Sequence, residues 1–191
     1  MKLIYLVMLC LPCGCISTAQ DGPPEKIDRT VSAQKAALRR APQLEALSWM
    51  VGNWSYDVFT MHPDGTEEVW LVDQRREVQF ERNRTWLRSD TIYPTQPLET
   101  QLNYLTFDLV EERWVSISFS NTGYQDIQFS EDTLEDGRLE FTGNTCNLSI
   151  APDGCQDIII KLSDERFDIL SKRFDKGRWV AFSRSEYTRV E

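Results

Sequence analysis

The sequence predicts an all-β protein, an antiparallel up-and-down barrel of about ten strands preceded by a short helix. Two observations lead to this prediction. Short segments of strand-forming residues follow one another from Gly52 to Tyr187, and turn residues such as Pro-Asp-Gly and Asp-Gly separate them. The connections are too short for the crossovers that a parallel sheet needs. Closure into a barrel also removes the two edge strands that an open meander of this length would expose.

The first 19 residues are interpreted as an export signal. Lys2 provides the positive start, and the apolar run Leu3–Leu11 is too short to span a hydrocarbon core of ~30 Å as a helix. Small residues before Gln20 favour cleavage after Ala19. Gly14-Cys15 is similar to a bacterial lipoprotein cleavage site, so a lipid anchor at Cys15 stays open. Both alternatives place the protein outside the cytoplasm, in the periplasm or cell envelope, with no transmembrane span in the mature chain.

Residues 20–43 are predicted to form a linker with a short helix, and residues 44–191 are predicted to form the barrel domain. Ile27–Arg40 is rich in helix-forming residues. Pro42–Met50 predicts a second helical turn, because proline is accepted at the first position of a helix. Three apolar residues of this turn fall on one face: Leu44, Leu47 and Met50.

The barrel strands are predicted from runs of β-branched and aromatic residues between turn signals. They are Gly52–Met61, Glu67–Phe80, Thr85–Tyr93, Gln101–Leu109, Trp114–Phe119, Gln125–Ser130, Arg138–Thr142, Asp157–Leu162, Arg166–Phe174 and Arg178–Tyr187. The fifth strand shows the alternation clearly. Val115, Ile117 and Phe119 point to one side of the sheet, and the two serines between them point to the other.

Cleavage after Ala19 leaves Cys146 and Cys155 of the five cysteines. An even pair in an oxidising compartment predicts one disulfide, which would contribute about 2–3 kcal/mol by closing a short loop. Two free buried thiols are the alternative. No metal site is predicted, because His62 is the single histidine and no second Cys-x-x-Cys follows the leader.

The charge of −9 and the pI of about 4.7 disfavour binding to nucleic acid or to anionic membrane surfaces. The sequence also lacks the Gly-x-Ser-x-Gly elbow, the P-loop and the Rossmann glycine fingerprint. Acidic pairs such as Glu111-Glu112 lie at turns, where they are expected to be solvated. No catalytic residue and no cofactor are therefore predicted.

The stretch LEALSWMVGNWSYDVF, Leu44–Phe59, contains Gly52-Asn53-Trp54 after a short helical turn. This arrangement resembles the Gly-x-Trp motif of calycin-like barrels, which include lipocalins and fatty-acid-binding proteins. The wider pattern is similar to a secreted bacterial domain family of unknown function. Three segments carry that resemblance: LSWMVGNWS, FDLVEERWVSISFSNTG and the closing EYTR. It extends over residues 44–191.

The resemblance implies roles for four residues that close the barrel. In calycins the motif tryptophan closes the base of the barrel and packs beneath an arginine of the last strand. Trp54 and Gly52 are the motif residues here, and Arg184 and Arg189 are the candidate arginines. Trp49 is expected to pack as a lid.

If Trp54 points inward, Tyr56 and Val58 do so too. Further residues are candidates for a ligand-binding lumen: Trp70, Trp86, Arg88, Asp90, Tyr104 and Phe182. A barrel of this size can hold one small ligand. Two points stay open. The aromatic side chains could instead fill the interior and leave no lumen, and Arg88 and Asp90 could instead form a salt bridge at the rim.

The leading functional prediction is binding of a small apolar or amphipathic ligand in the lumen. One alternative is an enzyme, an isomerase or hydrolase, that uses Arg88 and Asp90 in the same cavity. Another is a ligandless interaction module. A haem role as in the related nitrobindins is disfavoured, because those barrels need an axial histidine near the C-terminal strands and none follows His62. Tyr187 or another ligand would have to replace it. Ligand identity and oligomeric state are not predicted.

Overall fold

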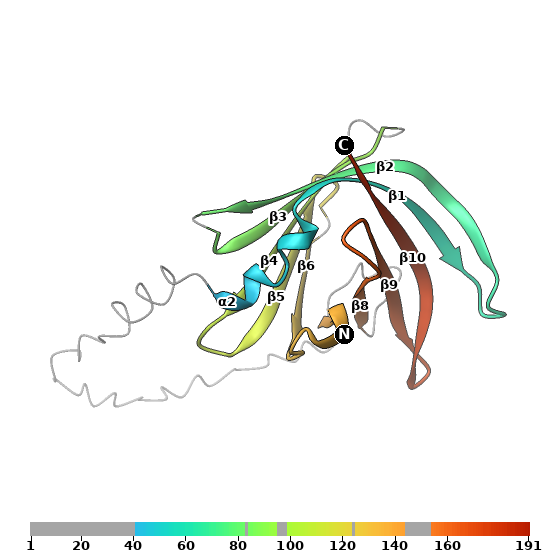
Figure 1. Cartoon of the computed structure of the whole chain (residues 1–191). Helices are drawn as coiled ribbons and strands as arrows, with labels where there is room; N and C mark the ends of the chain where they lie inside the picture. Colours follow the sequence, from blue (N-terminus) through green and yellow to red (C-terminus); the bar gives the residue numbers. More distant parts are fainter. Residues whose placement is uncertain (1–40, 83, 95–98, 124, 144–153) are drawn as a thin grey trace, which may run out of the picture.

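The chain forms a closed barrel of ten antiparallel strands (Figure 1). The computed structural model describes residues 41–82, 84–94, 99–123, 125–143 and 154–191. The predicted leader at 1–19, the predicted helix at Ile27–Arg40 and Cys146 lie outside these residues. Within them, the predicted all-β class and the short helix before the barrel are confirmed.

The observed strands overlap all ten predicted ones, and the largest difference at an end is Val190 in place of Tyr187. The strands are β1 (Gly52–Met61), β2 (Glu67–Glu81), β3 (Trp86–Ile92), β4 (Thr100–Asp108), β5 (Arg113–Ser120), β6 (Gln125–Ser130), β7 (Arg138–Gly143), β8 (Cys155–Lys161), β9 (Arg166–Asp175) and β10 (Arg178–Val190). A short 3₁₀ turn, η2 (Glu135–Gly137), precedes β7.

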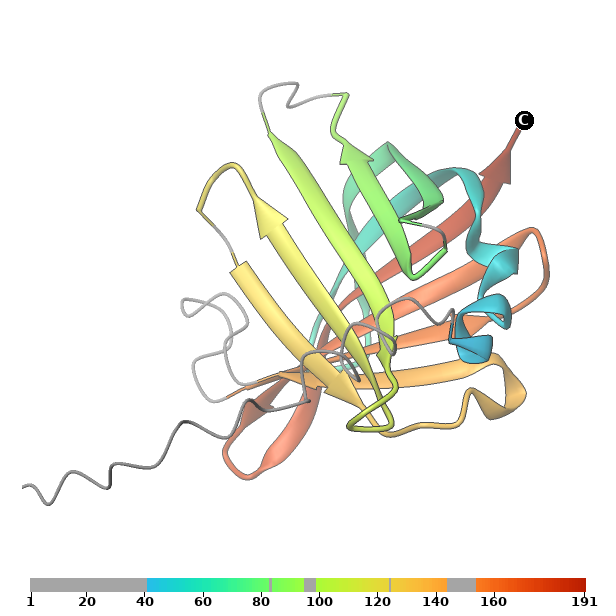
Figure 2. The ribbon, with the colours of Figure 1, turned by 90° about the vertical axis from the view of Figure 1, so that its left-hand side faces the viewer.

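Each strand pairs with the next one in the chain, and β10 pairs with β1 to close the ring (Figure 2). The β1–β10 seam is long, running from Asn53 opposite Val190 to Thr60 opposite Ser183. Because every strand has two neighbours, the barrel has no free sheet edge. The predicted up-and-down order is confirmed.

Two short helices, α2 (Pro42–Glu45) and η1 (Ser48–Met50), lead into β1. Proline begins α2, where its missing N–H costs no hydrogen bond. Leu44, Leu47 and Met50 are all buried and belong to the same apolar core as Trp54. The helices therefore cover one end of the barrel interior. No helix in the described part of the chain is long and apolar enough to cross a membrane.

The β1–β2 hairpin extends beyond the rest of the barrel (Figure 1). Strand β2 is 15 residues long, and its pairing with β1 shifts register near Tyr56 and Val58. The far part of the hairpin has only β10 as a further neighbour, so its side chains are open to solvent. Trp70 is 67% exposed there.

Inner and outer faces alternate along each strand, as period 2 requires. On β1, Trp54, Tyr56 and Val58 are all buried and face inward. On β5 the serines Ser116 and Ser118 line the interior, and the apolar residues between and beside them face outward. This part of the wall is therefore polar inside and apolar outside.

Candidate functional site

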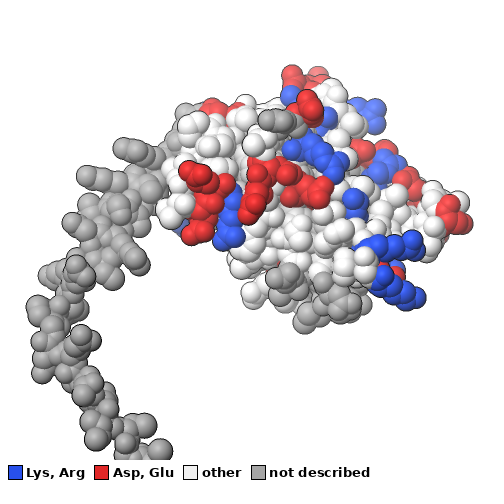
Figure 3. Space-filling model, turned by 90° about the horizontal axis from the view of Figure 1, so that it is seen from below, with Lys and Arg blue, Asp and Glu red and all other residues white. Residues whose placement is uncertain are grey.

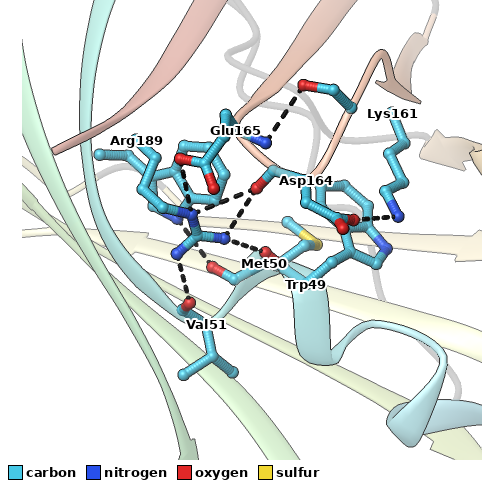
Figure 4. Close-up of polar contacts among 9 residues, drawn as sticks. Trp49, Met50, Val51, Lys161, Asp164, Glu165 and Arg189 are labelled. Atoms are coloured by element: carbon cyan, nitrogen blue, oxygen red, sulfur yellow. Dashed lines mark hydrogen bonds and ion pairs between the residues drawn. The ribbon is translucent and has the colours of Figure 1, made fainter.

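The closed end of the barrel is built around Trp54 and Arg189, and Figure 4 shows the contacts of Arg189 there. The Trp54 indole is fully buried and its Nε1 donates to the Met50 carbonyl at 2.7 Å. The Arg189 guanidinium carbon lies 4.3 Å from the centre of the indole ring. Such a cation over an indole face contributes ~0.5–2 kcal/mol, more when water is excluded.

Arg189 also ties the helical turn to the strands. Its Nη2 donates to the Trp49 carbonyl at 2.6 Å and its Nη1 to the Val51 carbonyl at 2.9 Å. Its Nε and Nη2 donate to the Asp164 carbonyl in the β8–β9 turn. One side chain thus joins the start of β1, the end of β10 and a turn between two other strands (Figure 4).

The structure explains why position 52 is a glycine. Its φ is +138°, and a Cβ there would lie 2.3 Å from Arg189 Nη1. Any other residue would therefore displace the guanidinium and strain the backbone. The two motif residues are linked through the arginine that both contact.

Arg184, the other arginine expected over Trp54, lies elsewhere. Its Nη2 pairs with Glu67 across the hairpin and its Nη1 pairs with Asp168 at 3.4 Å and with Glu186. Its guanidinium lies over the Phe59 ring at 4.9 Å. The side-chain hydrogen bond to Glu67 is the main cause that raises the pKa of Arg184 above its ordinary value. This cluster is on the outer face of β1, β9 and β10, away from Trp54.

A column of aromatic rings leads from the closed end into the barrel. Phe167 packs edge-on against Trp54 at 4.8 Å and is stacked on Tyr187 at 4.2 Å. Tyr187 is in turn stacked on Tyr56 at 4.6 Å. Arg76 ends the column, with its guanidinium 5.0 Å from the Tyr187 ring and 5.3 Å from the Tyr56 ring.

Beyond this column the barrel contains a cavity of about 200 Å³. Residues from β2 to β10 and from η1 line it. The apolar part of the lining is continuous with the closed-end core: Met50, Val78, Leu87, Leu105, Phe141, Ile159 and Ile169. The polar part is larger: Arg76, Ser89, Gln101, Asn103, Ser116, Ser118, Gln128, Asp157, Ser171, Ser185 and Tyr187.

A hydrogen-bonded row crosses the polar wall on β3 to β5. Ser118 Oγ donates to Asn103 Oδ1 at 2.6 Å, and Tyr93 Oη donates to Gln101 Oε1 at 2.9 Å. Asn103 Nδ2 and the hydroxyl of Ser89, its cross-strand neighbour, have no hydrogen-bond partner among the described side chains. The wall therefore keeps unused hydrogen-bonding capacity, which costs about 1–3 kcal/mol for each buried group left unpaired.

A carboxylate group lies on the β6–β8 side of the cavity. Asp157 Oδ1 accepts from Ser171 Oγ at 2.6 Å, and Asp157 Oδ2 accepts from Gln128 Nε2 at 2.7 Å. The same Gln128 nitrogen donates to Asp126 Oδ2 at 2.7 Å. One amide thus bridges two carboxylates, and this side of the lumen is negative.

Arg76 provides the positive side of the cavity. Burial disfavours its charge, but the nearby phenols of Tyr187 and Tyr56 offset this and the pKa of the guanidinium stays above its ordinary value. Burial also raises the pKa of the phenols of Tyr187 and Tyr93. At neutral pH the group is therefore one cation surrounded by neutral hydroxyls.

Of the candidate lumen residues, Tyr56 lies directly beneath this cavity, where it packs under Arg76. Tyr104 borders the cavity, but it pairs with Arg88 and Ile117 and its ring contacts Trp86, so its side chain is on the outer face of β4. Val58 is buried in the core but does not line the cavity. Phe182 is half-buried at a register shift between Ala181 and Ser183.

The other candidates lie on the outer face. Trp70 is exposed on the hairpin, and Trp86 contacts Tyr104 edge-on with ring centres 6.0 Å apart. Arg88 pairs with Asp90 at 2.9 Å and with Glu81 at 2.6 Å. They alternate with Leu87 and Ser89, which line the cavity, so the pair faces outward and not into the lumen. Hydrogen bonding to Glu81, then to Asp90, raises the pKa of Arg88.

His62 lies in the β1–β2 turn, with 43% of its side chain exposed and its Nε2 3.5 Å from Glu68. In the described ranges, no group of three or more His, Cys, Asp or Glu side chains is placed to hold a metal ion. Cys155 is buried at the start of β8. Its predicted partner Cys146 is not among the described residues, so the disulfide stays a prediction.

The outer surface mixes charges. On the face shown in Figure 3, acidic and basic side chains lie in small groups beside each other, with uncharged areas between them. Several charged side chains of the described surface form ion pairs, such as Lys161 with Asp164 at 2.6 Å and Arg138 with Glu140 at 2.6 Å. The net negative charge is therefore distributed and not concentrated on one binding face there.

Sequence reasoning missed the polar residues that make the cavity distinctive: Arg76, Asn103, Gln128 and Asp157. A signal for them exists. In β2, Gln74, Arg76 and Val78 share a face, and in β6 Asp126 and Gln128 do so. Alternation alone does not tell which face is inside, and polar sets are ordinarily placed in solvent.

The fold and this cavity define a closed antiparallel barrel with a mixed polar and apolar lumen. Among solved structures, the chain is similar to the protein in "Crystal Structure of Rv2717c from M. tuberculosis", with a TM-score of 0.53 and 14% identity over 80% of this chain and 100% of that one. At this identity the likeness shows the barrel fold alone. A redesigned β-barrel also aligns, with a TM-score of 0.29 and 13% identity over 76% of this chain and 96% of that one. No family model and no curated protein matches the sequence.

Proposed function

We propose that this chain is an exported calycin-like barrel that binds one small amphipathic molecule in its lumen and catalyses no reaction. The observation that carries the proposal is the lining of the 200 Å³ cavity, apolar toward the closed end and polar on the remaining wall. A purely apolar ligand would leave the polar wall unpaired, which is why an amphipathic ligand fits better.

The size of the cavity limits the ligand. At about 200 Å³ the cavity is smaller than pockets for drug-sized ligands, which have volumes of ~300–1,000 Å³. A long-chain lipid would not fit within this space, so the ligand is a short molecule.

Native mass spectrometry of protein purified from its own cells tests the proposal. We expect a retained small molecule that is released on unfolding. Ser116→Leu, which places a larger side chain into the lumen, should lose the molecule. Val115→Leu, on the outer face of the same strand, should retain it. A bare protein mass, with no small molecule rebinding after dialysis, would favour the ligandless interaction module.

The exported location is part of the same proposal and has its own test. The intact mass of the purified protein distinguishes cleavage after Ala19 from lipid attachment at Cys15. The same measurement after alkylation, with and without reductant, tests the Cys146–Cys155 disulfide. An uncleaved chain with both cysteines alkylated before reduction would contradict the export proposal.

A further inference from the structure

The cavity has charged residues of opposite sign on two sides. Arg76 is on β2 and Asp157 is on β8, and both line the same space. Around the ring, β1, β10 and β9 separate these two strands on one side, and β3 to β7 separate them on the other. The two side chains therefore approach the cavity from nearly opposite walls.

Neither residue forms an ion pair with another charged side chain in the described part of the chain. Within the described residues, Arg76 donates from its Nε to Thr91 Oγ1 at 3.2 Å, and its guanidinium lies beside Tyr56 and Tyr187. Cation–π contact holds the guanidinium in place but does not neutralise it. The terminal nitrogens, which form the bidentate face of an arginine, have no carboxylate acceptor.

Asp157 is in the complementary position. Its two oxygens each accept one hydrogen bond, from Ser171 and from Gln128, and both donors are neutral. A carboxylate offers about four acceptor sites, so each oxygen can accept a further donor. Asp126, held by the same Gln128, adds a second negative charge behind it.

Charges enclosed by a barrel wall are costly unless an opposite charge meets them. The cavity lies between the two groups, and both line it. We propose that the ligand is a small zwitterion, with its anionic group bound to Arg76 and its cationic group bound to Asp157. This inference rests on the proposed lumen binding and narrows it to a ligand class.

The hydrogen-bonding wall between the two charges supports the same class. Ser89 and Asn103 line the cavity, and Ser89 Oγ and Asn103 Nδ2 form no hydrogen bond with another described residue. The phenols around Arg76 stay protonated at neutral pH, so they can donate to an anionic group beside the guanidinium. The apolar residues toward the closed end suit a short methylene chain between the two charges.

Isothermal titration calorimetry with a matched set of compounds tests the inference on the unmodified protein. The zwitterions are ω-amino acids of increasing length, from glycine to 8-aminooctanoate. Hexanoate and hexylammonium serve as analogues of 6-aminohexanoate that each lack one charge. We expect one chain length to bind best, and each singly charged analogue of that length to bind about tenfold more weakly or worse, since a hydrogen bond to a charged group accounts for that factor.

Four variants test which residue binds the anionic group of the ligand and which binds its cationic group. Arg76→Gln should remove the preference for the zwitterion over the amine, and Asp157→Asn should remove the preference for the zwitterion over the acid. Arg88→Gln and Asp90→Asn are the controls, since they change the same residue types on the outer face of β3. They should leave every affinity within about twofold.

The outcomes separate the two proposals. Equal affinity for the zwitterion and a singly charged analogue would overturn the zwitterion inference and leave lumen binding intact. Absence of binding by the whole series, with a non-zwitterionic molecule retained by the native protein, would do the same. Absence of binding together with an empty native protein would overturn both. The compound series needs no variant, so the inference stays testable if Arg76→Gln does not fold.

Discussion

The two halves of the barrel interior differ in what fills them. The closed end is packed with large apolar side chains, and Leu44, Leu47, Trp54 and Phe167 have no exposed surface. The other half holds polar side chains around a cavity. Burial of apolar area is the main source of folding free energy, ~25 cal/mol per Å². The closed end therefore contributes most to the free energy of folding. The polar half contributes less than an equal volume of apolar core would.

The polar half also contains groups that reduce stability. Ser89 Oγ and Asn103 Nδ2 are buried without partners, and Arg76 is enclosed without a carboxylate. A barrel that served only as a folded module would gain from apolar residues at these positions. The difference between the halves supports the proposal that the polar residues serve binding, while the Gly-x-Trp end packs the apolar core.

The largest effect that tests this comparison is expected at the closed end. Trp54→Ala should lower the free energy of unfolding by about 3–5 kcal/mol, because it removes a fully buried indole and leaves a void beneath Arg189. Trp70→Ala is the matched control, since Trp70 is 67% exposed and should change stability by about 0.5 kcal/mol or less. Urea denaturation measures both. Similar losses for the two variants would show that the closed end is not the stabilising half.

Arg189→Met should give the next largest loss, about 2–3 kcal/mol. The variant keeps the volume of the stem but leaves the carbonyls of Trp49, Val51 and Asp164 without their donor. Arg138→Met removes an exposed arginine paired with Glu140 and should cost about 0.5 kcal/mol or less. Equal midpoints in urea for the two variants would contradict a closing role for Arg189.

The sequence predicted the fold far better than the lumen, and the two candidate arginines Arg184 and Arg189 show why. Turn residues and period-2 alternation are local, so ten strands and their order could be derived from them. The choice between Arg184 and Arg189 depends on which face of β10 is inward, and only the ring closure with β1 decides this. The resemblance supplied both candidates, and the register distinguishes them.

The lumen was harder to predict for the same reason. On β3, the sequence left open whether Arg88 and Asp90 point into the lumen or form a salt bridge at the rim. In the structure Ser89 faces the cavity, and the pair lies on the other face. Aromatic residues are ordinarily taken to mark the core side of a strand. Here the wall of β3 to β6 is apolar outside, with Phe119 and Ile127 exposed, and polar inside. Alternation separates the two faces of each strand, but it does not tell which face is inside.

Tyrosine ionisation at the boundary between the halves gives a pH-dependent prediction. Burial raises the pKa of Tyr187 above its ordinary value of 10.0. The neutral phenol is thus favoured in the folded state, and its contribution is fully present below pH 10 and lost as the pH rises above it. Wild-type stability should fall by up to about 1.4 kcal/mol per pH unit above pH 10 from this group.

The variant Tyr187→Phe isolates this contribution. Urea denaturation at pH 8 and pH 11 should show a smaller alkaline loss in the variant than in the wild type, by about 1 kcal/mol. Tyr93→Phe is the companion variant, since burial also raises the pKa of Tyr93. An unchanged alkaline loss in both variants would show that neither phenol is protected by the fold.

The smallest effect is expected in the polar half and has the opposite sign. Ser89→Ala should leave the free energy of unfolding unchanged or raise it by up to about 1 kcal/mol, because it removes a buried hydroxyl that has no hydrogen-bond partner among the described residues. Ser118→Ala is the matched control on the same wall. Its hydroxyl donates to Asn103 at 2.6 Å, so its removal should cost about 1 kcal/mol. Thermal denaturation compares the two variants on one scale. A loss for Ser89→Ala as large as for Ser118→Ala would mean that Ser89 is satisfied within the fold, and that less of the polar wall is available to a ligand.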